Sequence, residues 1–579
     1  MAQTAIISMW ELPAMSILDP IESYHMNNWD HTYDVVIVGS GVGGMVSALY
    51  AKANGLQPLI IEKSAQYGGS SALSGGGLWI PVNHHMTAEG IPDSIEKART
   101  YMANTVGDRV SQDKQEAYLQ YAREMAKWLE AETWMEFIRM DGYSDYYPER
   151  PGGLSQGRGL EAKPIDGRKL GSERGRLKEP SQSPPGPLSF TAGEFRFIGL
   201  VATTWRGRLE AAKVGLRTLR NLLLGRTPIT MGQALIGRLR MSLRDEHIPL
   251  WLKAPFEEFI VEDDRVIGVV ADREGHGRVR IQARDGVILA AGGFPHNEDM
   301  RETFQTDPIS TEWTVAHEGN TGDTITAAMY ELDAAVDLMD DAWWGPVSLP
   351  PGKDPAFHVA ERNEPGAIIV NGAGERFTNE SASYVDVVHE MYDGHTEATP
   401  HIPSYFIMDR RFRNKYVFGE LLPRQSFPAD FLESGYVKQA ETLPALADQI
   451  GVPRDALVDT IERFNAFARL GDDRDYDRGK SAYDRYYGDP SNEPNPCLGT
   501  IDESPFFAVE MWPGDLGTKG GLLTNANARV LRDDGLVIDG LYATGNNMAS
   551  VMGHTYPGPG STLGPSATFG YIAVEDLVE

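Results

Sequence analysis

Cysteine is almost absent from this chain, because Cys497 is the single one among 579 residues. One thiol excludes an intrachain disulfide framework and a metal cluster built on cysteine, and it fits a reducing cytoplasm. An apolar run of about 18 residues or more, the length of a membrane span, is missing as well. Residues 1–29 carry no lysine or arginine and so lack the basic start of a signal peptide. We therefore expect a cytoplasmic protein with an N-terminal arm at residues 1–31.

Positive charge is also scarce, and the formal net charge is −29. A nucleic-acid partner needs a basic surface, so this balance argues against one. We predict no metal-binding residues. The length of 579 residues is too great for one core, and it predicts several domains.

A nucleotide-binding motif follows the N-terminal arm. Residues 34–38 are a short β-branched run of the kind found in a buried parallel strand, and Gly-Ser-Gly-Val-Gly-Gly follows at 39–44. A helical pattern at 45–53, a second strand at 59–61 and Glu62 complete a βαβ unit. Gly39 suits the tight turn, Gly41 the approach of a diphosphate and Gly44 the helix–strand packing, while Glu62 suits a ribose hydroxyl.

Further glycine and serine residues favour FAD over NAD as the dinucleotide. Small residues continue after Lys63, and apolar strands at 286–293 and 540–546 end in small residues of the kind that pass beneath a flavin. A second glycine fingerprint is missing, so we do not expect a bound nicotinamide cofactor. The residues predicted to bind FAD, non-covalently, are Gly39, Ser40, Gly41, Gly43, Gly44, Glu62, Lys63, Gly69, Ser70, Ser71, Ser74, Gly75, Gly76, Gly292, Gly545, Asn546 and Leu563.

A tyrosine enclosed by glycine and proline stands near the C-terminus. Residues 553–565 read Gly-His-Thr-Tyr-Pro-Gly-Pro-Gly-Ser-Thr-Leu-Gly-Pro. The Tyr556 O–H and the Gly560 N–H can converge on one oxygen and stabilise the charge that develops when a ketone enolises. In isolation such a string is more typical of a surface turn, but the nucleotide motif favours a site.

With these motifs the chain resembles the bacterial 3-ketosteroid Δ1-dehydrogenases over most of its length. The segments that carry the resemblance are 39–44, 62–63, 67–71, 74–81, 142–148, 379–384, 515–521 and 553–560. The resemblance implies FAD-dependent removal of hydrogen from C1 and C2 of ring A, which converts a 4-ene-3-one to a 1,4-diene-3-one in steroid or sterol degradation.

The resemblance also implies roles for four residues. Tyr556 and Gly560 would hold the 3-keto oxygen, and Tyr384 would take the C2 proton while hydride leaves C1 for the flavin N5. Tyr146 would support Tyr384 as a relay to solvent. Relatives often carry proline where this chain has Ser383, which leaves the backbone geometry beside Tyr384 open.

Cofactor segments at both ends of the chain predict a discontinuous, Rossmann-like FAD-binding domain of the α/β class. We place it at residues 32–340 and 511–579, with an α+β catalytic domain at 341–510 that contributes Tyr384. The steroid would lie in the cleft between these domains. An external electron acceptor, for which a quinone is a candidate, must reoxidise the flavin.

A basic insert at about 181–228 departs from the acidic average. Six basic residues and only Glu210 as an acid fall within 200–226, and Leu209, Leu216, Leu219 and Leu223 share one face of a helical wheel. Such a helix can lie on an anionic membrane, and contact through residues 190–226 would place the protein peripherally on the inner face of the cell membrane. The alternative is a helix packed on the enzyme with its basic face solvated.

Three rival functions stay open at this point. A steroid dehydrogenase acting at C4–C5 would share most of these features, although the intact Tyr-Pro-Gly-Pro-Gly run favours C1–C2. A fumarate-reductase-like flavoprotein would need arginine and histidine where this chain offers tyrosine. In a non-enzymatic flavoprotein the basic helix would serve only as a tether.

Overall fold

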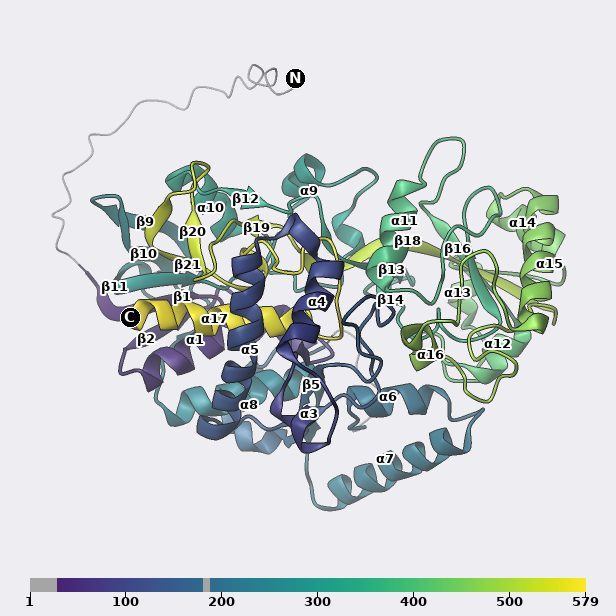
Figure 1. Ribbon diagram of the computed structural model, residues 1–579, viewed down its shortest axis with the longest axis horizontal. Helices are drawn as coiled ribbons and strands as arrows, with labels where there is room; N and C mark the ends of the chain where they lie inside the picture. The colour runs from purple at the N-terminus through teal and green to yellow at the C-terminus, as the bar shows by residue number, and fades with distance from the viewer. Residues whose placement is uncertain (1–28, 181–187) are drawn as a thin grey trace.

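The computed structural model describes residues 29–180 and 188–579 and combines helices with two main sheets (Figure 1). Most of the predicted arm and residues 181–187 of the predicted basic insert lie outside the described residues. The α/β class and the Rossmann-like architecture predicted from the sequence are confirmed.

The first sheet is built around the buried run predicted at 34–38. β1 (His31–Val38) pairs in parallel with β2 (Pro58–Ile61) and with β11 (Gly277–Leu289), and β21 (Val537–Ala543) pairs in parallel with β11. The sheet continues through β20 (Arg529–Leu531), β9 (Phe256–Glu262) and β10 (Arg265–Arg273) on one side and β8 (Leu250–Trp251) on the other. Strands from both ends of the chain therefore form one sheet.

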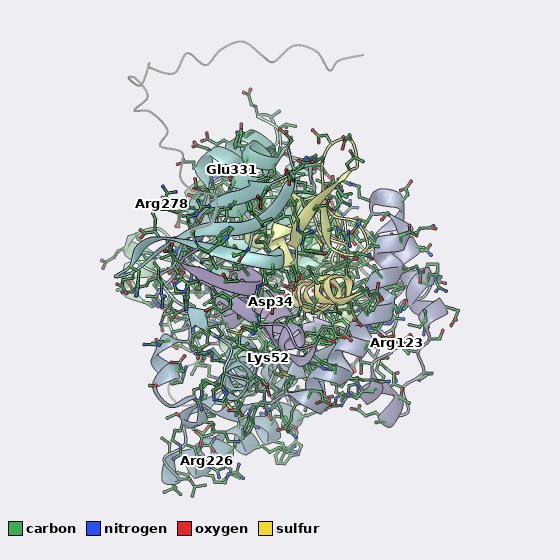
Figure 2. All side chains as sticks on the ribbon, turned by 90° about the vertical axis from the view of Figure 1, so that its left-hand side faces the viewer. Asp34, Lys52, Arg123, Arg226, Arg278 and Glu331 are labelled. Atoms are coloured by element: carbon green, nitrogen blue, oxygen red, sulfur yellow. The ribbon has the colours of Figure 1, made fainter. Side chains whose placement is uncertain are left out.

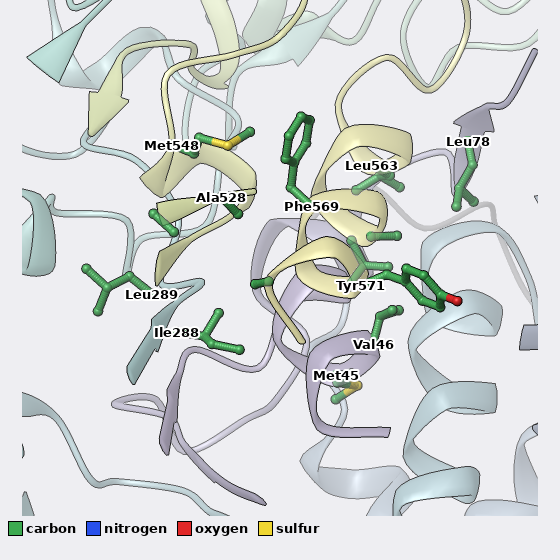
Figure 3. Close-up of a cluster of buried hydrophobic side chains, with 14 of the residues drawn as sticks. Met45, Val46, Leu78, Ile288, Leu289, Ala528, Met548, Leu563, Phe569 and Tyr571 are labelled. Carbon is green, nitrogen blue, oxygen red and sulfur yellow. The ribbon is translucent and has the colours of Figure 1, made fainter. Parts of the chain in front are cut away.

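Two helices from opposite ends of the chain pack together on this sheet (Figure 3). Val46 of α1 (Val42–Ala53) lies near Tyr571 of α17 (Leu563–Val578), while Met45 and Phe569 lie at opposite ends of the cluster and Ile288 and Leu289 of β11 lie to the left of the helices in this view. These side chains belong to the same buried core. The packing holds the C-terminal loop that precedes α17 against the nucleotide-binding unit.

The second sheet is antiparallel and has a core on each face. Its order is β14 (Ala356–Phe357), β13 (Ala342–Ser348), β18 (Phe506–Thr518), β16 (Ser404–Asp409) and β15 (Ala367–Val370), with β17 (Val437–Ala440) also paired to β18. Alternate residues of a strand point to opposite faces. Ile368 and Ile407 accordingly pack under α14 (Leu443–Ile450) and α15 (Arg454–Leu470), whereas Ile369 and Phe406 face the other core. β18 runs across the predicted domain boundary at residue 510, and the domain bounds themselves stay a prediction.

The basic insert forms α6 (Ala192–Gly199) and α7 (Trp205–Leu223), followed by α8 (Met231–Asp245). α7 lies at the lower margin of the molecule (Figure 1), and Arg226 just after it is at the lower end of the side view in Figure 2, away from Lys52 and Asp34. Tyr101 of α4 (Ile95–Thr105) and Lys114 of α5 (Gln112–Glu132) donate hydrogen bonds to the carbonyl oxygens of Pro557 and Ala549 in the segment that precedes α17. Among the described residues, no helix is both long and apolar enough to cross a membrane.

Candidate active site

A single cavity of about 1250 Å³ joins the predicted cofactor residues to the predicted catalytic tyrosines. It opens at the carboxyl ends of β1, β11 and β21, where ligands of parallel sheets bind. The predicted residues that line it are Gly39, Ser40, Gly41, Glu62, Lys63, Gly69, Ser70, Ser71, Ser74, Gly75, Gly76, Gly292, Gly545, Asn546, Leu563, Tyr146, Tyr384, Tyr556 and Gly560. Gly43 and Gly44 are the two predicted residues outside this set.

The glycines of the first turn are required by close packing. Gly39 has φ +108°, and a Cβ on it would lie 2.3 Å from the Ala290 carbonyl oxygen. A Cβ on Gly44 would lie 2.1 Å from the Gly39 carbonyl oxygen, and one on Gly43 would meet Thr544 and Ser566 at 2.8 Å. Gly43 and Gly44 are therefore required by the close packing of α1, and their contact with FAD stays a prediction.

The polar groups around this turn fit an adenine dinucleotide. Gly41 is the N-cap residue of α1 and has no side chain to cap the helix, while the Val42 N–H donates to Ser71 Oγ at 3.1 Å. Gly41 and Ser71 line the cavity, so this helix N-terminus suits a diphosphate. Glu62 accepts hydrogen bonds from the Ser40 N–H at 3.1 Å and the Ser40 O–H at 2.7 Å, which fixes its carboxylate at the end of β2. Ser70 is held in the same way by Asn320 at 2.8 Å, a residue that the sequence analysis did not single out.

Three tyrosine rings meet at the far end of the cavity. Tyr146 and Tyr556 are stacked with ring centroids 4.9 Å apart, and Tyr384 packs edge-on against them at 5.5 and 5.2 Å. All three side chains are buried. The Tyr146 O–H donates to the Tyr384 hydroxyl oxygen at 3.2 Å, so segments more than two hundred residues apart in the chain form one hydroxyl pair.

Tyr556 and Gly560 are the predicted hydrogen-bond donors at the tyrosine end of the cavity. Burial raises the pKa of Tyr556, while hydrogen bonding with Tyr384, with Thr562 and with the Gly560 N–H lowers it. Gly560 has φ +93°, a Cβ on it would lie 2.3 Å from the Gly77 carbonyl carbon, and its own carbonyl accepts from the Trp79 N–H at 3.1 Å. Only glycine fits this position.

Tyr384 is the first residue of α11 (Tyr384–Asp393), and Ser383 precedes it with φ −46° and ψ 130°. Proline adopts similar backbone angles. Ser383 therefore has a backbone geometry that a proline at this position would also adopt. Burial raises the pKa of Tyr384 well above its ordinary value, and the hydrogen bond from Tyr146 lowers it.

The structure separates Tyr146 from its neighbour Tyr147. The Tyr147 O–H donates to Asp386 Oδ1 at 2.9 Å, and its side chain is not part of the cavity lining. Tyr143, which the sequence analysis did not select, adds a third hydroxyl at 3.1 Å from that of Tyr146. Its only signal in the sequence is a spacing of three residues from Tyr146 in a tyrosine-rich segment.

Comparison with known proteins shows the family to which the chain belongs. The FAD binding domain family matches residues 34–563. A 3-oxosteroid 1-dehydrogenase of Mycobacterium tuberculosis is 48% identical over 556 residues, which cover 94% of this chain and 98% of that relative. The chain belongs to the 3-oxosteroid 1-dehydrogenase family.

Solved structures agree with this family assignment. The 3-ketosteroid Δ1-dehydrogenase of Sterolibacterium denitrificans, in complex with 1,4-androstadiene-3,17-dione, is 40% identical and has a TM-score of 0.91, with 95% of this chain and 99% of that chain covered. A 3-ketosteroid-Δ4-(5α)-dehydrogenase of Rhodococcus jostii is 21% identical with a TM-score of 0.68, over 97% of this chain and 100% of the other. The second similarity shows a shared fold alone.

Proposed function

We propose that this FAD-dependent 3-oxosteroid 1-dehydrogenase removes hydrogen from C1 and C2 of a 3-ketosteroid by means of Tyr384, Tyr556, Gly560 and Tyr146. The observation that carries these roles is that all four residues line one cavity together with the glycine turn for FAD. An uncharged steroid nucleus cannot be oriented by ion pairs, so an apolar pocket with a few polar groups suits it.

The ketone oxygen would lie between the Tyr556 O–H and the Gly560 N–H. Negative charge grows on this oxygen as C2 loses its proton, and two donors held by buried surroundings stabilise that charge without reorganising. The Gly560 carbonyl accepts a hydrogen bond from the Trp79 N–H, which anchors this residue to the strand that contains Trp79. This pair of donors makes the C2 hydrogen acidic.

Tyr384 would accept the C2 proton. Its raised pKa makes its phenolate a strong but scarce base, and the hydrogen bond from Tyr146 favours that phenolate. Tyr143 would extend the chain of hydroxyls through which the proton leaves. Bound FAD supplies the acceptor for the hydride from C1.

The activity is tested by anaerobic mixing of the FAD-loaded protein with a 4-ene-3-ketosteroid. We expect the flavin absorbance to bleach and the steroid to be recovered as the 1,4-diene-3-one. The matched control is the same steroid with a 3-hydroxyl group, which offers no ketone and should leave the flavin oxidised. Bleaching by a 5α-saturated 3-ketosteroid with formation of the 4-ene would instead indicate dehydrogenation at C4–C5.

Tyr146→Phe is expected to move the pH dependence of flavin reduction to more alkaline values. The variant lacks the hydrogen bond that lowers the pKa of Tyr384, so this pKa rises further and less phenolate is present at a given pH. The rate of flavin reduction at neutral pH should fall, and a higher pH should be needed to reach a given rate. Stopped-flow measurements from about pH 6 to about pH 10 follow this profile.

Tyr143→Phe is the control for this series, because it keeps the bond between Tyr146 and Tyr384. Its pH profile should move less than that of Tyr146→Phe. A Tyr146→Phe profile that superimposes on the wild-type curve would contradict the role of Tyr146 as a partner of the base.

We infer that α7 attaches the enzyme to an anionic membrane at the cytoplasmic side. The face of α7 that packs on the protein is formed by Gly207, Val214, Thr218 and Asn221, so the leucines face solvent. Leu216 is 69% and Leu223 79% exposed. An apolar face flanked by basic residues favours binding to anionic lipid, and it would bring the enzyme to an apolar substrate and to a lipid-soluble quinone as electron acceptor.

The triple variant Leu216→Gln, Leu219→Gln, Leu223→Gln is expected to lose this binding. Wild-type protein should sediment with phosphatidylglycerol vesicles but not with phosphatidylcholine vesicles, and less so at high salt. The control replaces Leu422, Leu470 and Leu536, which are comparably exposed elsewhere on the surface. Equal sedimentation of the two triple variants with anionic vesicles would refute this role of α7.

A further inference from the structure

A second cluster of chemically capable side chains lies outside the cavity. His84 and His85 begin α3 (His84–Ala88), and Glu130 lies near the end of α5. Both imidazole Nε2 atoms face the same carboxylate oxygen, Glu130 Oε2, and the His85 contact measures 2.9 Å. The three ligand atoms all lie within 4.8 Å of one another.

The surroundings hold these three side chains in place. Asn83, which is fully buried, caps α3 through the Met86 N–H at 3.1 Å and donates from its amide to the Ile80 carbonyl at 2.8 Å. The other oxygen of Glu130 accepts from the Phe137 N–H at 2.7 Å. The bond from the Phe137 N–H therefore holds the carboxylate so that Glu130 Oε2 points at the two imidazoles. Backbone hydrogen bonds of this kind orient metal ligands in known sites.

We propose that His84, His85 and Glu130 form a binding site for a divalent transition-metal ion such as Zn²⁺. Two imidazole nitrogens and one carboxylate oxygen form a ligand set that zinc, nickel, copper and cobalt prefer over magnesium or calcium. The three side chains are 29%, 24% and 20% exposed, so an ion can enter and keep a water ligand. The sequence analysis predicts no metal, because the third ligand is 45 residues from His85 and ordinary motif spacing does not reveal it.

Such an ion would connect α3 to α5 rather than take part in steroid chemistry. None of the three residues belongs to the cavity lining. α3 follows β3 (Gly77–Trp79), and Trp79 holds the Gly560 carbonyl. A bound ion would thus stabilise the scaffold on which the ketone-binding loop rests, and it should raise the Tm of the holoenzyme.

The test is calorimetric titration of Zn²⁺ into tag-free, FAD-loaded protein after treatment with a chelator. We expect saturable binding of one ion per chain. His84→Ala, His85→Ala and Glu130→Gln should each weaken binding by more than about tenfold, since loss of an outer-shell partner alone typically costs that much. Co²⁺ bound to the wild-type protein should show visible absorption bands, and these should disappear when Zn²⁺ displaces the Co²⁺. This measurement needs no variant.

The control variant His247→Ala, His276→Ala removes two exposed histidines elsewhere and should bind Zn²⁺ as the wild type does. Flavin content and circular dichroism establish that each variant is folded. If wild-type protein binds no Zn²⁺ beyond that bound by His84→Ala, His85→Ala, and Co²⁺ shows no such bands, the cluster is only an ion-paired histidine pair and the proposal fails.

Discussion

Tyr384→Phe is expected to reduce FAD about 10²–10⁴-fold more slowly than the wild type on mixing with a 4-ene-3-ketosteroid, because the variant lacks the proposed base. Phenylalanine keeps the ring that packs edge-on against Tyr146 and Tyr556, so the cavity should retain its shape. The steroid should therefore still bind, with a Kd close to that of the wild type. Rapid anaerobic mixing measures the rate, and titration of the flavin absorbance measures the binding.

The matched control for this variant is Tyr483→Phe. Tyr483 is also buried, with its ring 4.4 Å from that of Tyr146, but its hydroxyl has no hydrogen-bond partner among the described residues. The Tyr483→Phe variant should therefore reduce FAD at nearly the wild-type rate. If Tyr384→Phe does the same, another group removes the C2 proton.

Tyr556→Phe is expected to lower the rate of flavin reduction by about 10²–10³-fold, the usual effect of removing one donor to a developing oxyanion. The Gly560 N–H remains, so activity should fall without disappearing. The loss should appear mainly in kcat, because the donor stabilises the charged oxygen of the transition state more than the neutral ketone. Rapid mixing measures the rate of flavin reduction, and steady-state kinetics with an artificial electron acceptor measure kcat and KM separately.

The outcome that would contradict this role is a change confined to KM. It would mean that Tyr556 only binds the ketone and does not stabilise its enolate. Flavin content should be unchanged in this variant, since the ring of Tyr556 packs on Tyr146 and the hydroxyl does not support the nucleotide turn.

Much of the nucleotide-binding fold could be predicted because its signals are local. The β-branched run at 34–38 and the glycines after it give the strand and turn of β1, and α1 begins three residues before the predicted start, at Val42. Gly43 and Gly44 are helical despite their low helix propensity, since their lack of a side chain lets α1 pack closely. Tertiary packing, rather than helix propensity, therefore determines that α1 begins at Val42.

The parts that could not be predicted depend on contacts between distant residues. Tyr146 and Tyr147 are adjacent in a segment without regular structure, and only the bond of Tyr147 to Asp386 shows which of them turns to the cavity. The solvent-facing leucines of α7 are a similar case. The helical wheel predicts an apolar face, but which face packs on the protein depends on small residues such as Gly207.

The most direct measurement of the central claim is a single anaerobic turnover with a 4-ene-3-ketosteroid deuterated at C1. Hydride transfer from C1 predicts that flavin reduction slows severalfold relative to the unlabelled steroid, and that the 1,4-diene-3-one retains one fewer deuterium at C1. Deuterium at C6, which the proposed reaction does not touch, should leave the rate unchanged. Flavin reduction at the same rate with and without deuterium at C1, together with full retention of that deuterium in the product, would contradict the account.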